Sequence, residues 1–341
     1  MTRRAHAVPR AVIVHGVTDA TRPDEADTLE QVREVGAALR NLGFDTSERA
    51  LGLDLSPLAV LGVDPPDVVF NLVEALAGDG RLIQLAPAVM EHLGLVFTGS
   101  SATAVAVTTD KPLTKRLLQA AGVPVPATFD ATAARHIAER YIVKSLAEDA
   151  SFGIDEASVV LAGEAGAEIE RRRARYGGAW FAEEYIEGRE FNISLIVGDD
   201  GYPRVLPAAE IEFVGYSEGR PRIVDYAAKW DASSAGYHAT PRRFVSRSAE
   251  PGLVEELERL SLAAWRVLGL GGYARVDFRV AEDGRCLVLE ANANPCLSPD
   301  AGFAAAAAQA GLTYDAMIEM IVGAARRNAA GGASDAARTN S

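Results

Sequence analysis

The residues best suited to chemistry flank one predicted β-hairpin near the C-terminal end of the chain. Asp283-Gly284 is typical of a two-residue type I′ turn, which requires positive φ at both central positions. A hairpin centred on that turn places Asp277 directly opposite Glu290. Arg275 then lies opposite Asn292, and the alternation of side chains along a strand puts all four residues on one face. The sequence therefore predicts a polar face with two opposed carboxylates.

Two carboxylates in this arrangement repel each other, because opposed side chains have Cβ atoms only about 5 Å apart. A divalent cation between Asp277 and Glu290 would remove the repulsion. The two acids and the amide oxygen of Asn292 suit a hard ion such as Mg²⁺, with phosphate oxygens completing its octahedron. The alternative is a solvated polar face on which Arg275 and Arg279 neutralise the acids. The opposite face is predicted to be core and consists of Val276, Phe278, Val280, Leu287 and Leu289.

Lysine is rare in this chain, whose 34 basic residues include only four lysines: Lys111, Lys115, Lys144 and Lys229. Arginine is the default cation, so a retained lysine is expected where a compact ammonium is needed. Lys144 ends a predicted strand and precedes a loop of small residues, 147–153, whose N–H groups can reach phosphates. A plain turn is the alternative. The loop is not a P-loop, since no Gly-Lys-Ser/Thr sequence occurs.

The first third of the chain alternates strands and helices. Ala11–Val14 and Asp67–Leu72 read as strands, and Glu25–Leu42 and Leu82–Leu93 read as amphipathic helices. This order predicts a small parallel α/β domain that ends near Ala104.

The rest of the chain predicts α+β lobes. Asp110 is expected to cap a helix over Lys111–Ala121, which ends at Gly122. Strands are predicted over Tyr141–Lys144, Trp180–Ile186, Phe191–Val197, Gly271–Val280 and Cys286–Glu290, and helices over Leu253–Leu268 and Tyr314–Asn328. The predicted domains are the N-terminal α/β domain over 1–104, a central α+β lobe over 105–187 and a C-terminal α+β lobe over 188–328. The Ala/Gly/Ser-rich tail over 329–341 is predicted to be disordered.

Composition excludes several classes of protein. The 341 residues carry a net charge of −13, which argues against a general nucleic-acid binder. No apolar run reaches the ~18 residues that span a bilayer, and the apolar stretch after the basic N-terminus is too short for a secretion signal. A cytoplasmic protein without membrane association is expected. Cys286 and Cys296 form neither a disulfide framework nor a zinc pattern.

The order of the motifs resembles the D-alanine–D-alanine ligase branch of the ATP-grasp superfamily over residues 65–325. The matching segments are Phe70–Leu72, Phe97–Ser101, Thr109–Lys115, Ala121–Pro124, Ile142–Lys144, Glu183–Glu190, Ala274–Asp277 and Glu290–Pro295. This resemblance implies an ATP-grasp fold, in which a parallel N-terminal α/β domain is followed by two α+β lobes that enclose ATP. It also implies two Mg²⁺ ions, for which Mn²⁺ can substitute, and a homodimer.

The same resemblance implies a role for each matching residue. Lys111, Lys144 and Lys229 would contact ATP phosphates, whereas Lys115 is expected to be a solvated surface residue. Arg275 would stabilise the tetrahedral intermediate. The flap over the γ-phosphate would include Glu148, Ser151, Phe152 and Gly153. The adenine hinge would comprise Glu183, Glu184, Tyr185 and Ile186, and Glu190 would hold the ribose. The metal ions would be bound by Asp277, Glu290 and Asn292.

The implied reaction has two steps. A substrate carboxylate attacks the γ-phosphorus of ATP and forms an acylphosphate, with charge stabilisation supplied by metal and lysines. An amine then attacks the acyl carbon and phosphate leaves. Two alternatives stay open: transfer of the acylphosphate to another nucleophile such as a hydroxyl, or nucleotide binding without turnover.

The sequence departs from the family where the amino-acid substrates would bind. The Ser-x-Glu of the first loop is absent from His15–Asp19, and Glu74 stands near the family's second-strand histidine. The other replacements are Ala150 for the flap serine, Trp230 for a tyrosine, Cys296 for a glycine and Ala301 for a serine. Glu74 can bind an ammonium or be a surface acid, and Trp230, with Phe152, can widen an apolar pocket or be core. These departures predict a substrate site with Glu74, Trp230 and Cys296, and a product other than D-alanyl-D-alanine.

Overall fold

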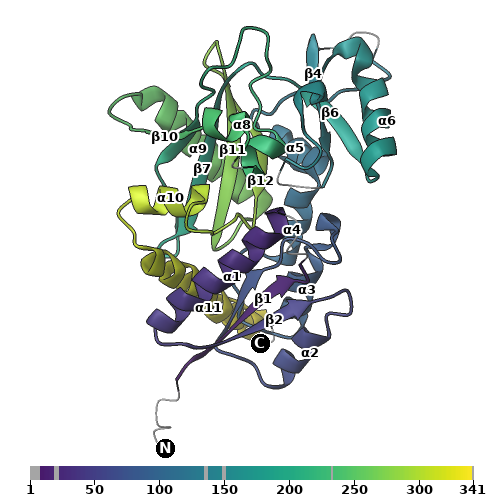
Figure 1. The fold of residues 1–341 in the computed structure, drawn as a ribbon. Helices are drawn as coiled ribbons and strands as arrows, with labels where there is room; N and C mark the ends of the chain where they lie inside the picture. Colours follow the sequence, from purple (N-terminus) through teal and green to yellow (C-terminus); the bar gives the residue numbers. More distant parts are fainter. Residues whose placement is uncertain (1–7, 19–22, 134–136, 148–150, 232, 340–341) are drawn as a thin grey trace, which may run out of the picture.

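The computed structural model describes residues 8–18, 23–133, 137–147, 151–231 and 233–339, with the backbone alone for 23–25, 230 and 331–339. A three-stranded parallel sheet forms the N-terminal part, with β1 (Arg10–Gly16) between β2 (Asp45–Leu51) and β3 (Val68–Leu72). The predicted parallel α/β start of the chain is confirmed (Figure 1). Its helices are α1 (Pro23–Asn41), α2 (Ser56–Val63), the single 3₁₀ turn η1 (Gly80–Leu82) and α3 (Leu85–His92).

Strand β2 has no counterpart in the sequence prediction. It lies at the edge of the sheet, and most of its side chains are exposed or half-buried. Polar residues such as Asp45 and Arg49 are tolerated there, so the strand lacks the apolar alternation that identifies a strand from sequence.

The second sheet is antiparallel and carries the predicted hairpin. Its strand order is β10-β9-β7-β11-β12, with β8 paired to β7. The strands are β7 (Gly188–Val197), β8 (Pro203–Val205), β9 (Ala208–Ile211), β10 (Arg242–Val245), β11 (Tyr273–Ala281) and β12 (Cys286–Asn292). One face packs in a common core with α4 (Ala102–Thr109), α5 (Lys111–Ala120) and α9 (Pro251–Leu268).

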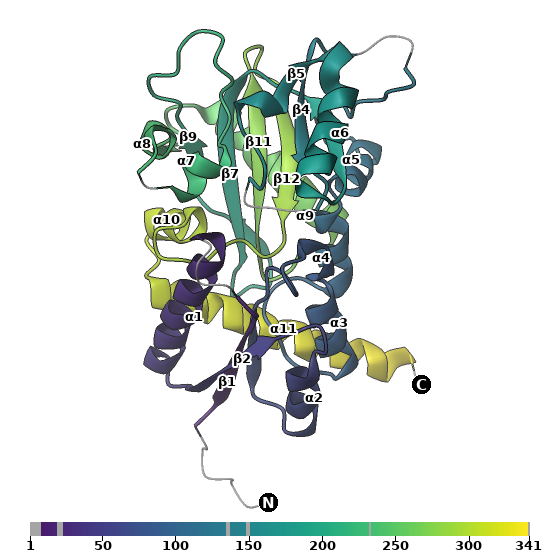
Figure 2. The same ribbon diagram turned by 45° about the vertical axis from the view of Figure 1, so that its right-hand side comes forward.

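A third, smaller sheet of order β5-β4-β6 stands beside the second one (Figure 2). It consists of β4 (Arg140–Ser145), β5 (Val159–Leu161) and β6 (Trp180–Glu184), and α6 (Ala165–Tyr176) packs on it. The remaining helices are the 3₁₀ turns η2 (Glu156–Ser158) and η3 (Ala162–Glu164), α7 (Tyr226–Trp230), α8 (Ala235–Ala239), α10 (Gly302–Gln309) and α11 (Tyr314–Thr339). Among the described residues, no helix is long and apolar enough to cross a bilayer.

The C-terminal helix α11 belongs to the N-terminal core. Met317, Ile318 and Ile321 share a buried cluster with Ile13 of β1 and Val35 of α1, and Figure 2 shows α11 running behind the parallel sheet. The helix continues to Thr339, where composition predicts a disordered tail from residue 329. An Ala-rich segment extends a formed helix easily, because extension avoids the cost of nucleation.

The predicted strand pairing is correct at the polar residues but not at the turn. Asp277 lies opposite Glu290 and Arg275 opposite Asn292. However, the Ala281 N–H donates to the Arg285 carbonyl at 2.9 Å, so the loop has three residues, 282–284. Only Gly284 of that loop has positive φ, so the turn is not type I′.

A β-bulge restores the predicted register. Phe278 faces Val288, and Leu289 is the extra residue between this pair and Asp277–Glu290. Val276, Phe278 and Val280 are core as predicted, and Val288 joins them. The assignment of Leu287 and Leu289 to that face was wrong. Leu287 pairs with Arg279 on the polar face, and Leu289 occupies the bulge.

The chain enters β7 through Gly188, which leads to a test of the fold. Its φ is +143°, and a Cβ there would lie 2.1 Å from the Val280 carbonyl oxygen. We expect Gly188→Ala to lower the free energy of unfolding by about 2–3 kcal/mol, measured by urea denaturation. Gly284→Ala is the control. At φ +85° it also places alanine in a left-handed backbone conformation, but a Cβ there would have no other atom within 4 Å, so it adds backbone strain without a clash. Equal losses in the two variants would contradict the steric argument.

Candidate active site

A fully buried carboxylate lies where the two α+β lobes meet. Glu183 on β6 is 0% exposed. Its Oε1 is 2.8 Å from Lys144 Nζ on β4, and its Oε2 is 2.6 Å from Lys115 Nζ on α5. Burial raises the pKa of Glu183, but the two ammonium groups outweigh it and the net direction is downward. The carboxylate is therefore held ionised by two cations.

The expectation that Lys115 is a solvated surface residue was wrong. Its side chain is 3% exposed, and Nζ also donates to the Leu289 carbonyl at 2.9 Å. Burial lowers the pKa of Lys115, and Glu183 opposes that shift. Helix α5 buries Lys111, Thr114 and Lys115 on one side, as expected for residues three or four positions apart.

Asp277 is held from its own strand and from the neighbouring strand β7. Arg275 donates to its two oxygens from Nε at 2.7 Å and from Nη2 at 2.8 Å, and Asn192 Nδ2 donates to Oδ1 at 2.9 Å. Asn192 lies opposite Asp277 on β7, so the second sheet fixes this contact. The sequence analysis did not identify Asn192, because the pairing of β7 with β11 joins residues 85 positions apart.

Glu290 lies among converging cations. Burial raises its pKa, but Lys111, Lys144, Arg275 and Lys229 together lower it well below its usual range. Lys111 Nζ is 4.0 Å from Glu290 Oε2. The three lysines predicted from sequence to contact phosphates and the arginine predicted to stabilise the tetrahedral intermediate thus act electrostatically on one carboxylate.

The donor set fits Mg²⁺ bound together with phosphate. Asp277 and Glu290 present carboxylates from adjacent strands, and Asn292 adds an amide oxygen that already accepts from the Asn294 N–H at 2.9 Å. The part of the chain that the structure describes contains no cluster of three His, Cys, Asp or Glu residues able to cage a metal. Protein donors alone would leave coordination positions open, which suits an ion that shares nucleotide phosphates.

Most polar groups of the predicted adenine hinge, 183–186, are already hydrogen-bonded within the protein. The Glu184 and Tyr185 N–H groups donate to the carbonyls of Ala127 and Arg140. The Tyr185 ring lies under the guanidinium of Arg140 at 4.7 Å, and its hydroxyl accepts from the Arg222 N–H at 2.8 Å. Tyr185 therefore supports the hinge, and Ile186, also buried, follows it directly.

Glu190 lies on the same side of the second sheet as Asp277. It is opposite Arg279, with 3.7 Å between Oε2 and Nη1. Burial raises the pKa of Glu190, and Arg279 opposes that shift. Leu287, on the other side of Arg279, adds a buried apolar surface that the sequence analysis had assigned to the core.

The flap loop is described from Ser151 onward, and Glu148 and Ala150 lie outside the described residues. Ser151 Oγ donates to the Val224 carbonyl at 2.8 Å, and Gly153, with φ +64°, offers its carbonyl to Arg172. Phe152, expected from sequence to make a pocket wider or more apolar, is half-buried in an aromatic cluster of the smaller lobe. Its ring packs against Tyr176 and Trp180 at centroid distances of 5.6 and 6.4 Å.

Glu74 and Cys296 do come together, at the junction with the N-terminal domain. Gln31 Nε2 donates to Glu74 Oε1 at 3.0 Å, and Cys296 Sγ donates to Asp27 Oδ2 at 3.0 Å. Ser298 Oγ donates to the other Asp27 oxygen at 2.6 Å. Burial, with Glu74 and Asp27 nearby, raises the pKa of the Cys296 thiol.

Sequence reasoning missed Asp27, Gln31 and Ser298 in this network. Asp27 and Gln31 are four residues apart on α1, so helical spacing could have placed them on one face. Trp230 ends α7, and its side chain is not described.

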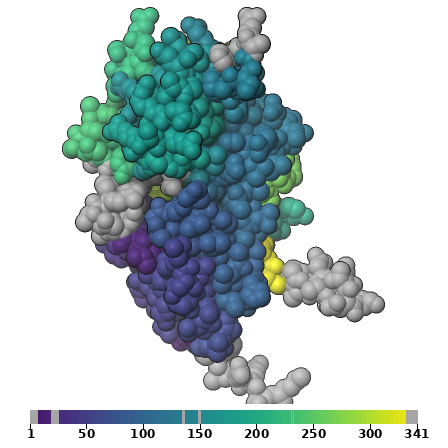
Figure 3. All heavy atoms as spheres, turned by 90° about the vertical axis from the view of Figure 1, so that its right-hand side faces the viewer, coloured from purple at the N-terminus to yellow at the C-terminus, as the bar shows by residue number. Residues whose placement is uncertain are grey.

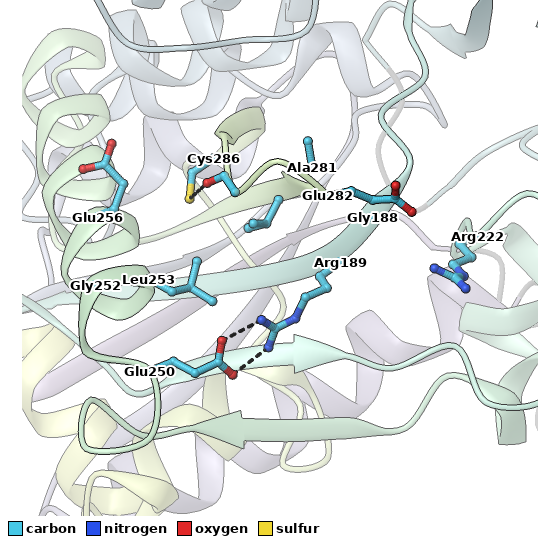
Figure 4. Close-up of a pocket in the computed structure, with 12 residues that line it drawn as sticks. Gly188, Arg189, Arg222, Glu250, Gly252, Leu253, Glu256, Ala281, Glu282 and Cys286 are labelled. Atoms are coloured by element: carbon cyan, nitrogen blue, oxygen red, sulfur yellow. Dashed lines mark hydrogen bonds and ion pairs between the residues drawn. The ribbon is translucent and has the colours of Figure 1, made fainter.

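A separate hollow lies at the turn end of the same hairpin (Figure 4). Arg189 is its central cation, but this guanidinium is 2.7 Å from both Glu210 and Glu250. No residue that lines the hollow belongs to the candidate phosphate and metal site, although strands β7, β11 and β12 contribute to both. Because Arg189 is already matched by two carboxylates, the hollow adds nothing to the candidate chemistry.

Comparisons with known proteins agree with the geometry. Residues 128–323 match the family model described as the D-ala D-ala ligase C-terminus. A D-alanine–D-alanine ligase of Halorhodospira halophila is 30% identical over 325 residues, covering 94% of this chain and 97% of that protein. An enzyme of the same name from Chelativorans sp. is 31% identical over 297 residues, covering 84% and 88%. The uncharacterised protein y4sG of Sinorhizobium fredii is 30% identical over 308 residues, covering 86% of both.

Solved structures agree on the fold. The D-alanine–D-alanine ligase of Bacillus anthracis complexed with ATP superposes with a TM-score of 0.72 at 19% identity, covering 96% of this chain and 100% of that one. The ligase of Coxiella burnetii gives 0.69 at 17% identity, covering 96% and 97%. The predicted ATP-grasp fold is confirmed. In Figure 3 the chain is viewed from the side of the smaller sheet, with the two lobes above the N-terminal domain.

The metal assignment leads to a second test. We expect Glu290→Gln to reduce Mg²⁺-dependent phosphate release from ATP at least about 100-fold, because the isosteric amide removes a charged ligand and leaves the core face of β12 intact. Phosphate release is measured with pooled amino acids, together with the melting temperature. Glu282→Gln, exposed in the loop of the same hairpin, is the control. Near-normal release by Glu290→Gln at saturating Mg²⁺ would rule out the metal assignment.

Proposed function

Because this chain belongs to the D-alanine–D-alanine ligase family of ATP-grasp enzymes, we propose that it joins amino-acid-like substrates other than two D-alanines. The coarser activity, an ATP-dependent ligase that forms a C–N bond between a carboxylate and an amine, follows from the family. The proposal concerns which carboxylate and which amine react.

The phosphate end of the site would carry out the first step. A substrate carboxylate attacks the γ-phosphorus, and ADP leaves the resulting acylphosphate. Lys111, Lys144 and Lys229 would balance the phosphate charge, because all three already act on Glu290. Magnesium, when bound, supplies further charge stabilisation at the phosphates, and Asp277, Glu290 and Asn292 would hold it.

The second step would take place nearer the N-terminal domain. An amine attacks the acyl carbon, and phosphate leaves. Arg275 would stabilise the oxyanion, since its guanidinium is fixed by Asp277 beside the metal ligands. Its pKa is raised, because Asp277 and Glu290 outweigh the opposing effect of burial, so the group stays charged throughout.

One observation carries the proposal of altered substrates. Glu74, Gln31, Asp27 and Cys296 form a connected acidic network where the sequence departs from the cell-wall enzymes. We propose that this network faces the amino-acid substrates and that Glu74 binds an ammonium group. Two carboxylates at this end would favour a cationic amine, and a site with different hydrogen-bonding partners discriminates strongly against the original substrate.

Further parts of the proposal follow the family resemblance. We propose that two Mg²⁺ ions serve the site, that Mn²⁺ can replace them, and that the protein acts as a homodimer in the cytoplasm. Metal titration and sedimentation would test the ions and the dimer.

The substrate proposal predicts failure with D-alanine. With enzyme, ATP, Mg²⁺ and D-alanine we expect no D-alanyl-D-alanine by mass spectrometry and only background phosphate release. With a panel of paired amino acids and diamines we expect a product whose mass identifies the nucleophile. Dipeptide formation from D-alanine at a few turnovers per second would overturn the proposal. A product that contains an ester would favour a hydroxyl nucleophile.

The lysine assignment predicts that Lys144→Arg is impaired although its charge is kept. A planar guanidinium cannot replace an ammonium 2.8 Å from a fully buried carboxylate without moving β4. We expect kcat/KM for ATP to fall at least about tenfold, with Arg173→Lys on exposed α6 as the control. Values of kcat and KM that both stay within about twofold would contradict the need for a compact ammonium.

A further inference from the structure

Lys115 makes two contacts, each to a different strand of the proposed site. Its Nζ is 2.6 Å from Glu183 Oε2 on β6 and 2.9 Å from the Leu289 carbonyl oxygen on β12. The first contact leads to Lys144, which shares the same carboxylate. The second leads to Glu290, the residue that follows Leu289.

We propose that Lys115 is a positioning residue that sets both the phosphate-binding Lys144 and the metal-binding Glu290 without touching ATP or metal itself. This inference rests on the proposed ATP and magnesium site.

The charges around Glu183 leave one positive charge available to a phosphate. Glu183 is fully buried, and its two oxygens are each matched by one lysine. The cluster of two lysines and one carboxylate carries one net positive charge, which remains available to a phosphate. If Lys115 were neutral, Glu183 would cancel Lys144, and an isolated buried ion pair attracts an incoming anion far less.

The second contact of Lys115 lies at the bulge in β12. Leu289 is the extra residue of the bulge and falls outside the regular pairing with β11. Its carbonyl accepts from Lys115 Nζ at 2.9 Å, so a side chain of α5 is anchored to the bulge itself. Without the bulge the strand would shift by one residue, and a shift of one residue turns Glu290 to the opposite face. Lys115 therefore stabilises the register in which Glu290 faces Asp277.

The two contacts also explain the residue type. An ammonium can donate to a carboxylate and to a carbonyl in different directions from one point, whereas a guanidinium is planar and larger. This chain uses arginine for nearly all its cations, so lysine at a buried position with two acceptors agrees with a need for the compact group.

The test measures binding of a non-hydrolysable ATP analogue by calorimetry over a series of Mg²⁺ concentrations, so it does not require the substrate to be known. The variants are Lys115→Met, which removes the charge, and Lys115→Arg, which keeps it. Arg116→Met removes an exposed cation from the same helix. Leu118→Ala opens the core one turn along the same helix and controls for simple destabilisation.

For Lys115→Met we expect the Kd of the analogue to rise at least about tenfold and the Mg²⁺ concentration for half-maximal binding to rise at least about threefold. Lys115→Arg should recover part of the nucleotide affinity but not the Mg²⁺ requirement. Both controls should stay within about twofold in both quantities, although Leu118→Ala lowers the melting temperature. Lys115→Met values within about twofold of wild type, or losses equal to those of Leu118→Ala, would overturn the proposal.

A double variant covers the case in which Lys115→Met does not fold. Lys115→Met with Glu183→Gln removes the buried carboxylate together with the ammonium of Lys115, and it keeps the positive charge of Lys144, whose side chain is 13% exposed. We expect this protein to bind the analogue while still requiring more Mg²⁺, because the Leu289 carbonyl has lost its donor. A wild-type Mg²⁺ requirement would overturn the role in positioning Glu290. Failure of the wild-type protein to bind the analogue would instead contradict the proposed function.

Discussion

A carboxylate that is sealed from water has to be matched by cations, and this requirement at Glu183 organises the site. Lys115 comes from α5, Lys144 from β4 and Glu183 from β6, and the Leu289 carbonyl joins them from β12. Breaking such a buried pair by removing one partner costs about 3–5 kcal/mol, because the remaining charge is left unmatched. The smaller sheet, helix α5 and strand β12 are therefore held together at one point.

Around that point the charges divide the site into two ends. Lysines and Arg275 converge on Glu290 and lower its pKa, so this end suits phosphate and a hard metal ion together. At the other end, the carboxylates of Asp27 and Glu74 are linked through the side-chain amide of Gln31. By charge alone, the first end would attract an anionic nucleotide and the second a cationic amine.

The two ends are connected through the N-terminal domain. Asn294 follows the proposed metal ligand Asn292 by two residues. It donates to the Val73 carbonyl at 3.0 Å and accepts from the Tyr273 hydroxyl at 2.8 Å. Leu297 N–H donates to Gln31 on α1 at 2.9 Å. Strand β12, which carries the proposed metal ligands Glu290 and Asn292, therefore continues directly into the segment beside Glu74. Helix α11, which shares a core with β1, fixes the remaining side of this junction.

The sequence by itself determined two features, the pairing of residues within one hairpin and the protein family, because both can be inferred from local patterns and from the order of motifs. Asp277 opposite Glu290 follows from hairpin pairing within one local segment, and the order of lysines and acids identified the ATP-grasp family. Even there, the predicted type I′ turn was wrong, and a bulge at Leu289 compensated for the longer loop. That bulge depends on contacts that hairpin propensity does not encode.

Only the tertiary structure decided which side chains are buried by distant partners. From its position in a short helix, Lys115 is expected to be exposed. In the folded protein it is buried and contacts Glu183 and Leu289, which lie far along the chain. Asn192, Asp27 and Gln31 join the site in the same way. The stability of a buried charge depends on where its counter-charge lies in space, and sequence spacing does not determine that distance.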